Sequence, residues 1–299
     1  MKILLLGKNG QVGWELQRAL APLGDVVALD IDSTGDWQAD FTQPEALAAT
    51  LRAVAPQVVV NAAAHTAVDK AEGEPELARA INADAPRVIG REAAALGAWL
   101  VHYSTDYVFD GSGSHPWRED AATGPLNVYG RTKLEGEDAI RASGCRHLIL
   151  RTSWVYAARG SNFARTMLRL AAERATIDVV DDQVGAPTGA ELLADITAHA
   201  LRTLQSHPEL SGTYHAAAGG ETSWYGYARH VIGFARAAGQ ALEATPESLR
   251  PVASSAFATA ARRPANSRLD TSRLRAAFGL ALPHWQTGVD RMLAEVLGR

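Results

Sequence analysis

The sequence holds one cysteine, Cys145, and only three methionines among its 299 residues, and it has no long apolar run. A single cysteine excludes an internal disulfide framework and a multi-cysteine metal site, and it is typical of a reducing compartment. The apolar run at residues 3–6 is too short for a signal-peptide core, and no run approaches the roughly 20 apolar residues of a membrane span. We therefore expect a cytoplasmic protein that does not bind membranes.

An excess of charge of one sign is also lacking. The 29 basic and 33 acidic residues give a net charge of −4 without a prominent basic cluster, which argues against nucleic acid as a partner. Apolar residues make up 47% of the chain and charged residues 21%, a composition typical of globular proteins rather than disordered ones. The length allows one large domain or two joined domains.

Short aliphatic runs alternate with longer segments of helical spacing in the first half of the chain. The runs predict strands at residues 3–6, 26–29, 58–60, 99–103 and 148–150, and the helical segments lie at 11–20, 44–54, 75–96 and 127–142, where 75–96 is long enough for two helices. Such alternation produces parallel strands with helices on both faces of the sheet. We predict an α/β fold, a Rossmann-type doubly wound parallel sheet over residues 1–155, with residues 156–299 as a smaller substrate-binding domain. A later strand could rejoin the first sheet.

A glycine-rich turn follows the first predicted strand and opens the first predicted helix. Its glycines are Gly7, Gly10 and Gly13, a G-x-x-G-x-x-G spacing that differs from the usual G-x-G-x-x-G. Glycine permits the tight turn, lets a pyrophosphate approach the backbone, and lets the helix pack against the strand. The unpaired N–H groups of the helix N-terminus favour an anion. This strand–turn–helix context predicts a dinucleotide site rather than a plain loop.

Asp30 ends the second predicted strand, 17 positions after Gly13. A carboxylate at that point accepts hydrogen bonds from ribose hydroxyls and repels a 2′-phosphate, which favours NADH over NADPH. The alternative interpretation is an aspartate that caps a helix or closes a turn.

Tyr129 and Lys133 lie four residues apart in a predicted helix, which puts both side chains on one face. A nearby ammonium stabilises a phenolate, so this pair suits a tyrosine that passes a proton to a carbonyl oxygen. A hydroxyl is expected beside the pair at the carboxyl end of the fourth strand, where open α/β sheets bind ligands. Thr105 supplies it, and Asp106 follows. A simple turn after the strand is the alternative interpretation of these two residues.

Taken together, the motifs resemble the extended short-chain dehydrogenase/reductase superfamily and, within it, the family of reductases that act on dTDP-4-dehydrorhamnose. The matching segments run nearly end to end, at residues 7–16, 61–69, 104–109, 125–130, 151–156, 183–188 and 261–264. The first and fourth segments occur throughout the superfamily, whereas 61–69 and the last three are more specific to these reductases. Thr105 stands where many superfamily members carry serine, which keeps the hydroxyl.

The resemblance implies hydride transfer from NADPH or NADH to the C4 carbonyl of dTDP-4-dehydrorhamnose. It implies Tyr129 as the proton donor, Lys133 as the residue that orients the ribose and lowers the tyrosine pKa, and Thr105 as support for the carbonyl. The cofactor residues implied for the pyrophosphate, the adenosine and the nicotinamide half are Gly7, Gly10, Gln11, Val12, Gly13, Asp30, Asp40, Phe41, Ala64, His65, Thr66 and Tyr103.

On the substrate side, the resemblance implies contacts from Thr105, Asp106 and Trp154, although a tryptophan at position 154 also suits an ordinary apolar core. Arg262 and Arg263 follow in an irregular stretch, and guanidinium groups suit a diphosphate. A solvated pair is the other interpretation of these arginines. Some relatives form homodimers around Mg²⁺, and the matching carboxylates are Glu15, Glu191 and Glu295.

Two other classes of function stay open at this point. Nucleotide-sugar 4-epimerases and other reductases of the superfamily share the nucleotide turn and the Tyr–Lys pair. The related dehydratases carry a second carboxylate after the Thr-Asp pair, where this chain has Tyr107. A non-catalytic relative, a regulatory subunit of methionine adenosyltransferase, binds nucleotide without consuming it, and the intact Tyr129 and Lys133 argue against that class.

Overall fold

A parallel sheet of six strands forms the larger lobe of the protein in a computed structural model that describes residues 1–298. The order across the sheet is β10-β5-β4-β3-β1-β2, and every neighbouring pair runs parallel. The strands are β1 (Lys2–Leu6), β2 (Asp25–Leu29), β3 (Val58–Asn61), β4 (Trp99–Thr105), β5 (Arg146–Thr152) and β10 (Gly212–His215). The predicted doubly wound fold is therefore confirmed.

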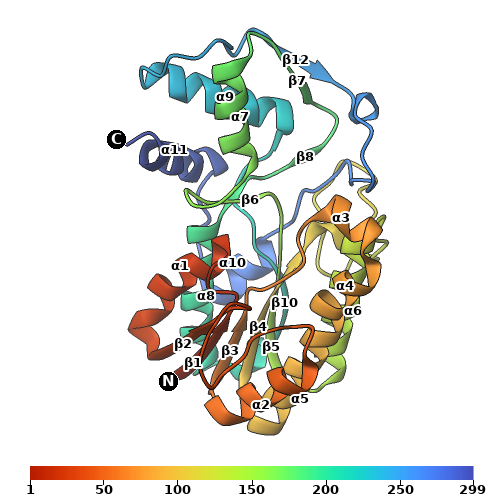
Figure 1. Cartoon of the computed structure of the whole chain (residues 1–299), viewed down its shortest axis with the longest axis vertical. Coiled ribbons are helices and arrows are strands. Elements are labelled where there is room, and N and C mark those ends of the chain that lie inside the picture. Colours follow the sequence, from red (N-terminus) through yellow and green to blue (C-terminus); the bar gives the residue numbers. More distant parts are fainter. Residues whose placement is uncertain (299) are drawn as a thin grey trace.

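Helices cover both faces of this sheet (Figure 1). On one face, α1 (Gln11–Leu20), α8 (Ala190–Leu204) and α10 (Ser272–Phe278) share an apolar cluster with the odd-numbered residues of β1 and β4. On the other face, α2 (Pro44–Val54), α5 (Ala85–Leu96) and α6 (Val128–Ala142) pack on the even-numbered ones. Burial on both faces explains why these strands are continuous apolar runs.

The smaller lobe has its own apolar core, at the top of Figure 1. Its helices are α7 (Phe163–Glu173), α9 (Trp224–Ala237) and α11 (Trp285–Val296). Its short strands pair two by two, and they are β6 (Val155–Tyr156) with β9 (Thr188–Gly189), β7 (Ile177–Val180) with β12 (Leu249–Val252), and β8 (Val184–Gly185) with β11 (Thr222–Ser223). Residues 190–215 and 272–278, by contrast, belong to the larger lobe.

The segment predicted as helical at residues 75–96 is divided in the structure. It consists of α4 (Pro75–Arg79), a wide π-helical turn at Ala80–Asp84, and α5, and it follows α3 (Val68–Gly73). Single π turns of this kind are frequent at functional sites. Within the described residues, no helix combines the length and the apolar character that crossing a membrane requires.

The chain changes sides of the sheet between β1 and β3, because β2 lies beyond β1 and all later strands lie beyond β3. In open α/β sheets, ligands bind outside the carboxyl ends of the strands at such a reversal. A cleft of about 540 Å³ lies there.

Candidate active site

The glycine turn lies at the reversal point and is shaped by close backbone contacts. Gly7 has a φ of +88°, and a Cβ on it would lie 2.7 Å from the backbone N of Ala63. A Cβ on Gly13 would lie 1.9 Å from the carbonyl oxygen of Gly7, so only glycine lets α1 start this close to β1. Gly10, at the N-cap of α1, offers no capping side chain, which leaves the first N–H groups of the helix available to an anion.

Asp30 lines the same cleft as Gly7, Gly10, Gln11 and Val12. Its carboxylate is held by two backbone N–H groups, from Asn9 at 2.9 Å and from Ile31 at 2.8 Å. These bonds fix the carboxylate at the tip of β2, so the cleft fits a dinucleotide whose pyrophosphate meets α1 and whose ribose meets Asp30.

Two residues predicted to contact the adenine lie outside the lining of the cleft. Asp40 accepts hydrogen bonds from the backbone N–H and the hydroxyl of Thr42. Phe41 is buried in the apolar cluster beneath α2. The Phe41 side chain shares that cluster with Leu6 and Leu29, at the ends of β1 and β2, and a contact of this pair with the adenine stays a prediction.

The predicted catalytic residues meet in the cleft. Thr105 ends β4, and Tyr129 and Lys133 come from α6. Burial raises the pKa of Tyr129 to about 12, against the opposing effect of its hydrogen bond with Thr105, and the carboxyl of Asp106 raises it further. Tyr129 therefore carries its proton at neutral pH, and the lowering of its pKa that the resemblance implied for Lys133 is not found. The ring of Tyr107 packs edge-on against it, with centroids 5.6 Å apart.

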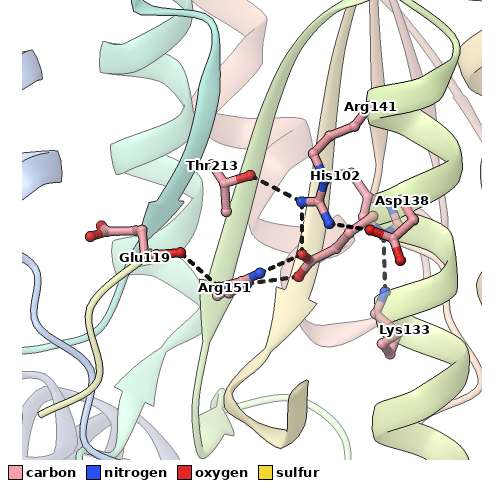
Figure 2. A network of polar contacts seen from close by, with 8 residues as sticks. His102, Glu119, Lys133, Asp138, Arg141, Arg151 and Thr213 are labelled. Atoms are coloured by element: carbon pink, nitrogen blue, oxygen red, sulfur yellow. Dashed lines mark hydrogen bonds and ion pairs between the residues drawn. The ribbon is translucent and has the colours of Figure 1, made fainter. Parts of the chain in front are cut away.

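The Lys133 side chain is buried, and polar contacts with β4 hold it in place. Its Nζ donates to the carbonyl oxygen of Tyr103 at 2.6 Å and lies 3.2 Å from Nε2 of His102, a contact seen in Figure 2. Burial lowers the lysine pKa to about 8, although Glu137 acts in the opposite direction. His102 is fully buried, and its Nδ1 lies 3.1 Å from the side-chain Nδ2 of Asn61.

Asp106 is 2% exposed, and it lies in a 3-10 turn directly after β4. Its Oδ1 accepts a hydrogen bond from the hydroxyl of Thr105 at 3.1 Å, while its Oδ2 has no partner among the described residues. Burial raises the pKa of this carboxyl to about 7, against hydrogen bonds from Ser267 and Thr105 that lower it. The carboxyl lines the cleft beside Tyr129.

The loop after β3 forms the wall expected for the nicotinamide half. Ala64 and Thr66 line the cleft, whereas His65 is turned toward Glu74, with 3.5 Å between its Nε2 and the carboxylate. The backbone of His65 is bonded twice by the Asn82 side chain, at 2.9 Å and 3.1 Å. Asn82 comes from the π-helical turn, so that turn fixes the loop.

Tyr103 also lines the cleft, and its hydroxyl lies 2.5 Å from that of Thr197 on α8. Trp154, in the segment between β5 and β6, has a φ of +49°, which is unusual for a residue other than glycine. Its indole is stacked on Trp224, with centroids 3.6 Å apart. Such a backbone conformation is characteristic of functional sites, and Trp154 lines the cleft.

A second cavity of about 1280 Å³ adjoins the cleft, and Trp224 lines both. Arg263, on its wall, is paired with Asp69 at 2.6 Å. The side chains of Arg262 and Arg174 also line it, and Arg262 interacts electrostatically with Asp110 on the same wall. This cavity therefore offers guanidinium groups next to the cleft.

A buried ion pair between Arg151 and Glu137 joins α6 to the sheet. Arg151 on β5 makes two hydrogen bonds to the carboxylate of Glu137, at 2.9 Å and 2.7 Å, and Arg141 adds a third at 3.0 Å. Figure 2 shows the surrounding network, in which Arg151 also reaches the backbone of Glu119. The network ties the helix that carries Tyr129 to β5 of the sheet.

The three carboxylates predicted as Mg²⁺ ligands do not form a metal site in this structure. Glu15 and Glu191 interact electrostatically, and each lies 3.5 Å from an arginine, Arg18 and Arg291 respectively. Residues 1–298 contain no group of three or more His, Cys, Asp or Glu side chains that could hold a metal ion. The donor set does not fit Mg²⁺ within one chain, and we derive no step through a metal.

Sequence reasoning missed His102, Asn82 and Trp224. His102 could have been found from the sequence. It lies two residues after Leu100 in the same strand and therefore on the same buried sheet face, the one that α6 covers, where a polar residue requires a partner. Asn82 and Trp224 had no such signal, because their roles depend on a π turn and on a contact between distant segments.

Fold and site together define a class. A Rossmann-type sheet with a glycine turn at its reversal point and a Thr–Tyr–Lys group beside it is the arrangement of the nicotinamide-dependent oxidoreductases of the short-chain dehydrogenase/reductase type. At 20% identity, a UDP-glucose 4-epimerase from Thermus thermophilus in complex with NAD shares this fold, with a TM-score of 0.80 over 100% of this chain and 99% of that one.

The chain belongs to the RmlD substrate binding domain family, whose pattern matches residues 1–297. It is 57% identical to the dTDP-4-dehydrorhamnose reductase of Escherichia coli K12 over 99% of this chain and 98% of that one, and 46% identical to that of Burkholderia thailandensis over 100% of both. The resemblance predicted from the sequence is thereby confirmed.

Solved structures agree with this assignment. A dTDP-4-dehydrorhamnose reductase from Clostridium acetobutylicum is 33% identical, with a TM-score of 0.88 and full coverage of both chains. The Bacillus anthracis enzyme, solved in complex with NADP, is also 33% identical, with a TM-score of 0.87 over 98% of this chain and 99% of that one.

Proposed function

We propose that the protein reduces the C4 carbonyl of dTDP-4-dehydro-β-L-rhamnose to dTDP-β-L-rhamnose, with NADPH or NADH as the hydride donor. The observation that carries the proposal is the meeting of Thr105, Tyr129 and Lys133 in the cleft that holds the glycine turn. The identity of 57% to a dTDP-4-dehydrorhamnose reductase over nearly the whole chain supports the substrate.

The nicotinamide cofactor, when bound, supplies the hydride to the carbonyl carbon. Tyr129 donates its hydroxyl proton to the carbonyl oxygen as charge develops there, and its pKa of about 12 ensures that the proton is present beforehand. Thr105, at the end of β4, donates a hydrogen bond to the same oxygen. Lys133 is held in place by Tyr103 and His102, and its positive charge stabilises the phenolate left behind.

The second cavity suits the dTDP half of the substrate. Trp224 lines both this cavity and the cleft, and it is stacked on Trp154, so the sugar ring of the substrate would lie near this stack. Arg262 is the better candidate for the diphosphate, because Arg263 is already neutralised by Asp69.

The resemblance further supports a homodimer, and the single cysteine supports a cytoplasmic location. Sedimentation velocity of the purified protein, over a range of concentrations, tests the dimer directly. A mass equal to that of one chain at all concentrations would contradict it.

The decisive test is an assay of reduced-nicotinamide absorbance with dTDP-4-dehydrorhamnose generated in situ, run with NADPH and then with NADH. We expect oxidation that depends on the dTDP-sugar and yields dTDP-rhamnose. A folded protein that binds nucleotide but consumes none would favour a non-catalytic regulator, and interconversion of sugars without net oxidation would favour an epimerase.

A further inference from the structure

Asn127 joins the helix that carries Tyr129 to a segment 135 residues further along the chain. The residue is buried and lies directly before α6. Its side-chain Oδ1 accepts the backbone N–H of Gly130 at 2.8 Å, and its Nδ2 donates to the backbone oxygen of Arg262 at 2.8 Å. Because a backbone N–H only donates and a carbonyl oxygen only accepts, these two bonds fix the orientation of the amide. One side chain is therefore both the cap of the helix and its link to Arg262.

The segment around Arg262 is held on its other side by α3. Oδ1 of Asp69 accepts the backbone N–H of Ala261 at 3.0 Å, and Oδ2 pairs with the guanidinium of Arg263 at 2.6 Å. Both neighbours of Arg262 are thus tied to α3, while its own carbonyl is tied to Asn127. These bonds fix the backbone of Arg262, and the residue lines the second cavity.

The start of α6 is fixed as well, and Tyr129 lies in its first turn. The backbone oxygen of Asn127 accepts the N–H of Arg131 at 3.1 Å. A Cβ on Gly130 would lie 2.2 Å from the backbone oxygen of Tyr107, so this turn of the helix packs tightly against the 3-10 turn after β4. The proton donor is thus two residues from Asn127, which is one hydrogen bond from the arginine segment.

We propose that Asn127 is a positioning residue for the reduction, which holds Arg262 in place for the diphosphate of the substrate and at a set spacing from Tyr129. This role rests on the proposed function and adds to it a basis for specificity. A nucleoside diphosphate bound by the arginine brings the carbonyl of its sugar to the proton donor. A guanidinium that shifts with its backbone loses this alignment, even where the helix itself is intact.

Two substitutions separate the link from the cap. Asn127→Asp keeps an oxygen for the N–H of Gly130 but places its other oxygen opposite the Arg262 carbonyl. Asn127→Ser keeps a neutral cap, and its side chain is too short to reach Arg262. For both variants we expect a KM for dTDP-4-dehydrorhamnose about tenfold above wild type, as for the loss of one hydrogen bond. The change in kcat should be smaller, and the affinity for NADPH should stay the same in titration calorimetry.

A double-substitution cycle with Arg262→Met distinguishes positioning from helix stability. Without the guanidinium the link has nothing to position, so Asn127→Ser should change the KM of Arg262→Met by less than about twofold. The control is Arg169→Met, which removes an exposed arginine of α7 that does not line the second cavity. In that background Asn127→Ser should again raise the KM about tenfold.

An equal rise of the KM in the Arg262→Met and Arg169→Met backgrounds would show that Asn127 acts only as a helix cap, and an unchanged KM in both single variants would exclude the link. Either result overturns this proposal while wild-type activity stands. Titration calorimetry with dTDP follows the same cycle without turnover, and its Kd should change as the KM does. A wild-type enzyme that binds dTDP without turnover would overturn the proposed function, whereas the dTDP cycle would still decide whether Asn127 positions Arg262.

Discussion

At the scale of single residues, Tyr129 shows why burial matters to the chemistry. Because burial raises its pKa to about 12, the phenol is a donor over the whole physiological pH range. Tyr129→Phe keeps the ring and its edge-on contact with Tyr107 but removes the proton. We expect turnover to fall by about 10²–10⁴-fold, with NADPH affinity nearly unchanged by titration calorimetry.

Tyr225→Phe is the matched control for that substitution, since Tyr225 contacts Arg229 on α9 and lies outside the lining of the cleft. It should retain wild-type turnover. Full activity in Tyr129→Phe would remove this residue from the reaction.

Asp30 controls a different property, the preference between the two nicotinamide cofactors. Its carboxylate is fixed by the N–H groups of Asn9 and Ile31, so it cannot easily turn away from a 2′-phosphate. Asp30→Ala should therefore shift the ratio of kcat/KM for NADPH over that for NADH upward by about tenfold, which corresponds to about 1.4 kcal/mol. Asp32→Ala, which removes the carboxylate that binds the Asn9 side chain, is the control, and an equal shift in both variants would contradict the role of Asp30.

The sequence predicted those residues whose chemistry follows from a local motif. Tyr129 and Lys133 were predictable from helical spacing, and Gly13 from its place after a strand. His102 acts through partners on β3 and α6, and no local pattern specifies such partners. Phe41 was implied only by the family resemblance, and its side chain is buried in the apolar core, so its contact with the cofactor stays a prediction.

At the scale of elements, α6 and the π-helical turn are packed so closely that adding a single methyl group to α6 should disturb their contact. A Cβ at Gly136 would lie 2.1 Å from the backbone oxygen of Asn82. Gly136→Ala should push the turn away and lower the free energy of unfolding by about 1–3 kcal/mol. Because Asn82 holds the His65 loop, the KM for the cofactor should rise as well.

Gly73→Ala is the control, since nothing lies within 4 Å of a Cβ at that position. It should change stability little in urea titrations. If Gly136→Ala and Gly73→Ala had the same free energy of unfolding, the close packing of α6 on the π-helical turn would contribute nothing to stability.

Sequence periodicity located the elements of the large sheet well, because buried parallel strands and amphipathic helices have distinct spacings. It allowed two helices within residues 75–96 but could not place the π turn between them, where the Asn82 side chain bonds to another loop. The short strands of the smaller lobe, such as β6 and β8, have two residues each, too few to show any period.

At the scale of the whole molecule, the Arg151–Glu137 pair links the catalytic helix to the sheet. Burial alone would raise the pKa of Glu137, but the hydrogen bonds and charge of Arg151 outweigh it and hold that pKa below its ordinary value of 4.5. A carboxyl with a lowered pKa contributes stability above pH 4.5, and that contribution is lost as the pH falls through the folded-state pKa.

Arg151→Met should therefore lower the free energy of unfolding at pH 7 by about 3 kcal/mol, since it leaves a buried carboxylate with fewer partners. The difference from wild type should narrow as the pH falls below 4.5, which chemical denaturation at several pH values can follow. Arg169→Met, which breaks an exposed pair with Glu173, should cost less than about 1 kcal/mol. If the difference in free energy of unfolding between wild type and Arg151→Met did not change with pH, the stabilisation by Arg151 would not depend on the charge of Glu137.

The order in which the large sheet is assembled has a consequence for synthesis of the chain. Five of its strands come from residues 2–152, but the edge strand β10 comes from 212–215, and α8 and α10 cover one face with residues 190–204 and 272–278. A ribosome delivers the N-terminal end first, so the growing chain exposes an apolar sheet face until nearly all of it has emerged. The nucleotide cleft therefore cannot mature as an independent early unit, and a nascent chain stalled near residue 155 should be bound by chaperones.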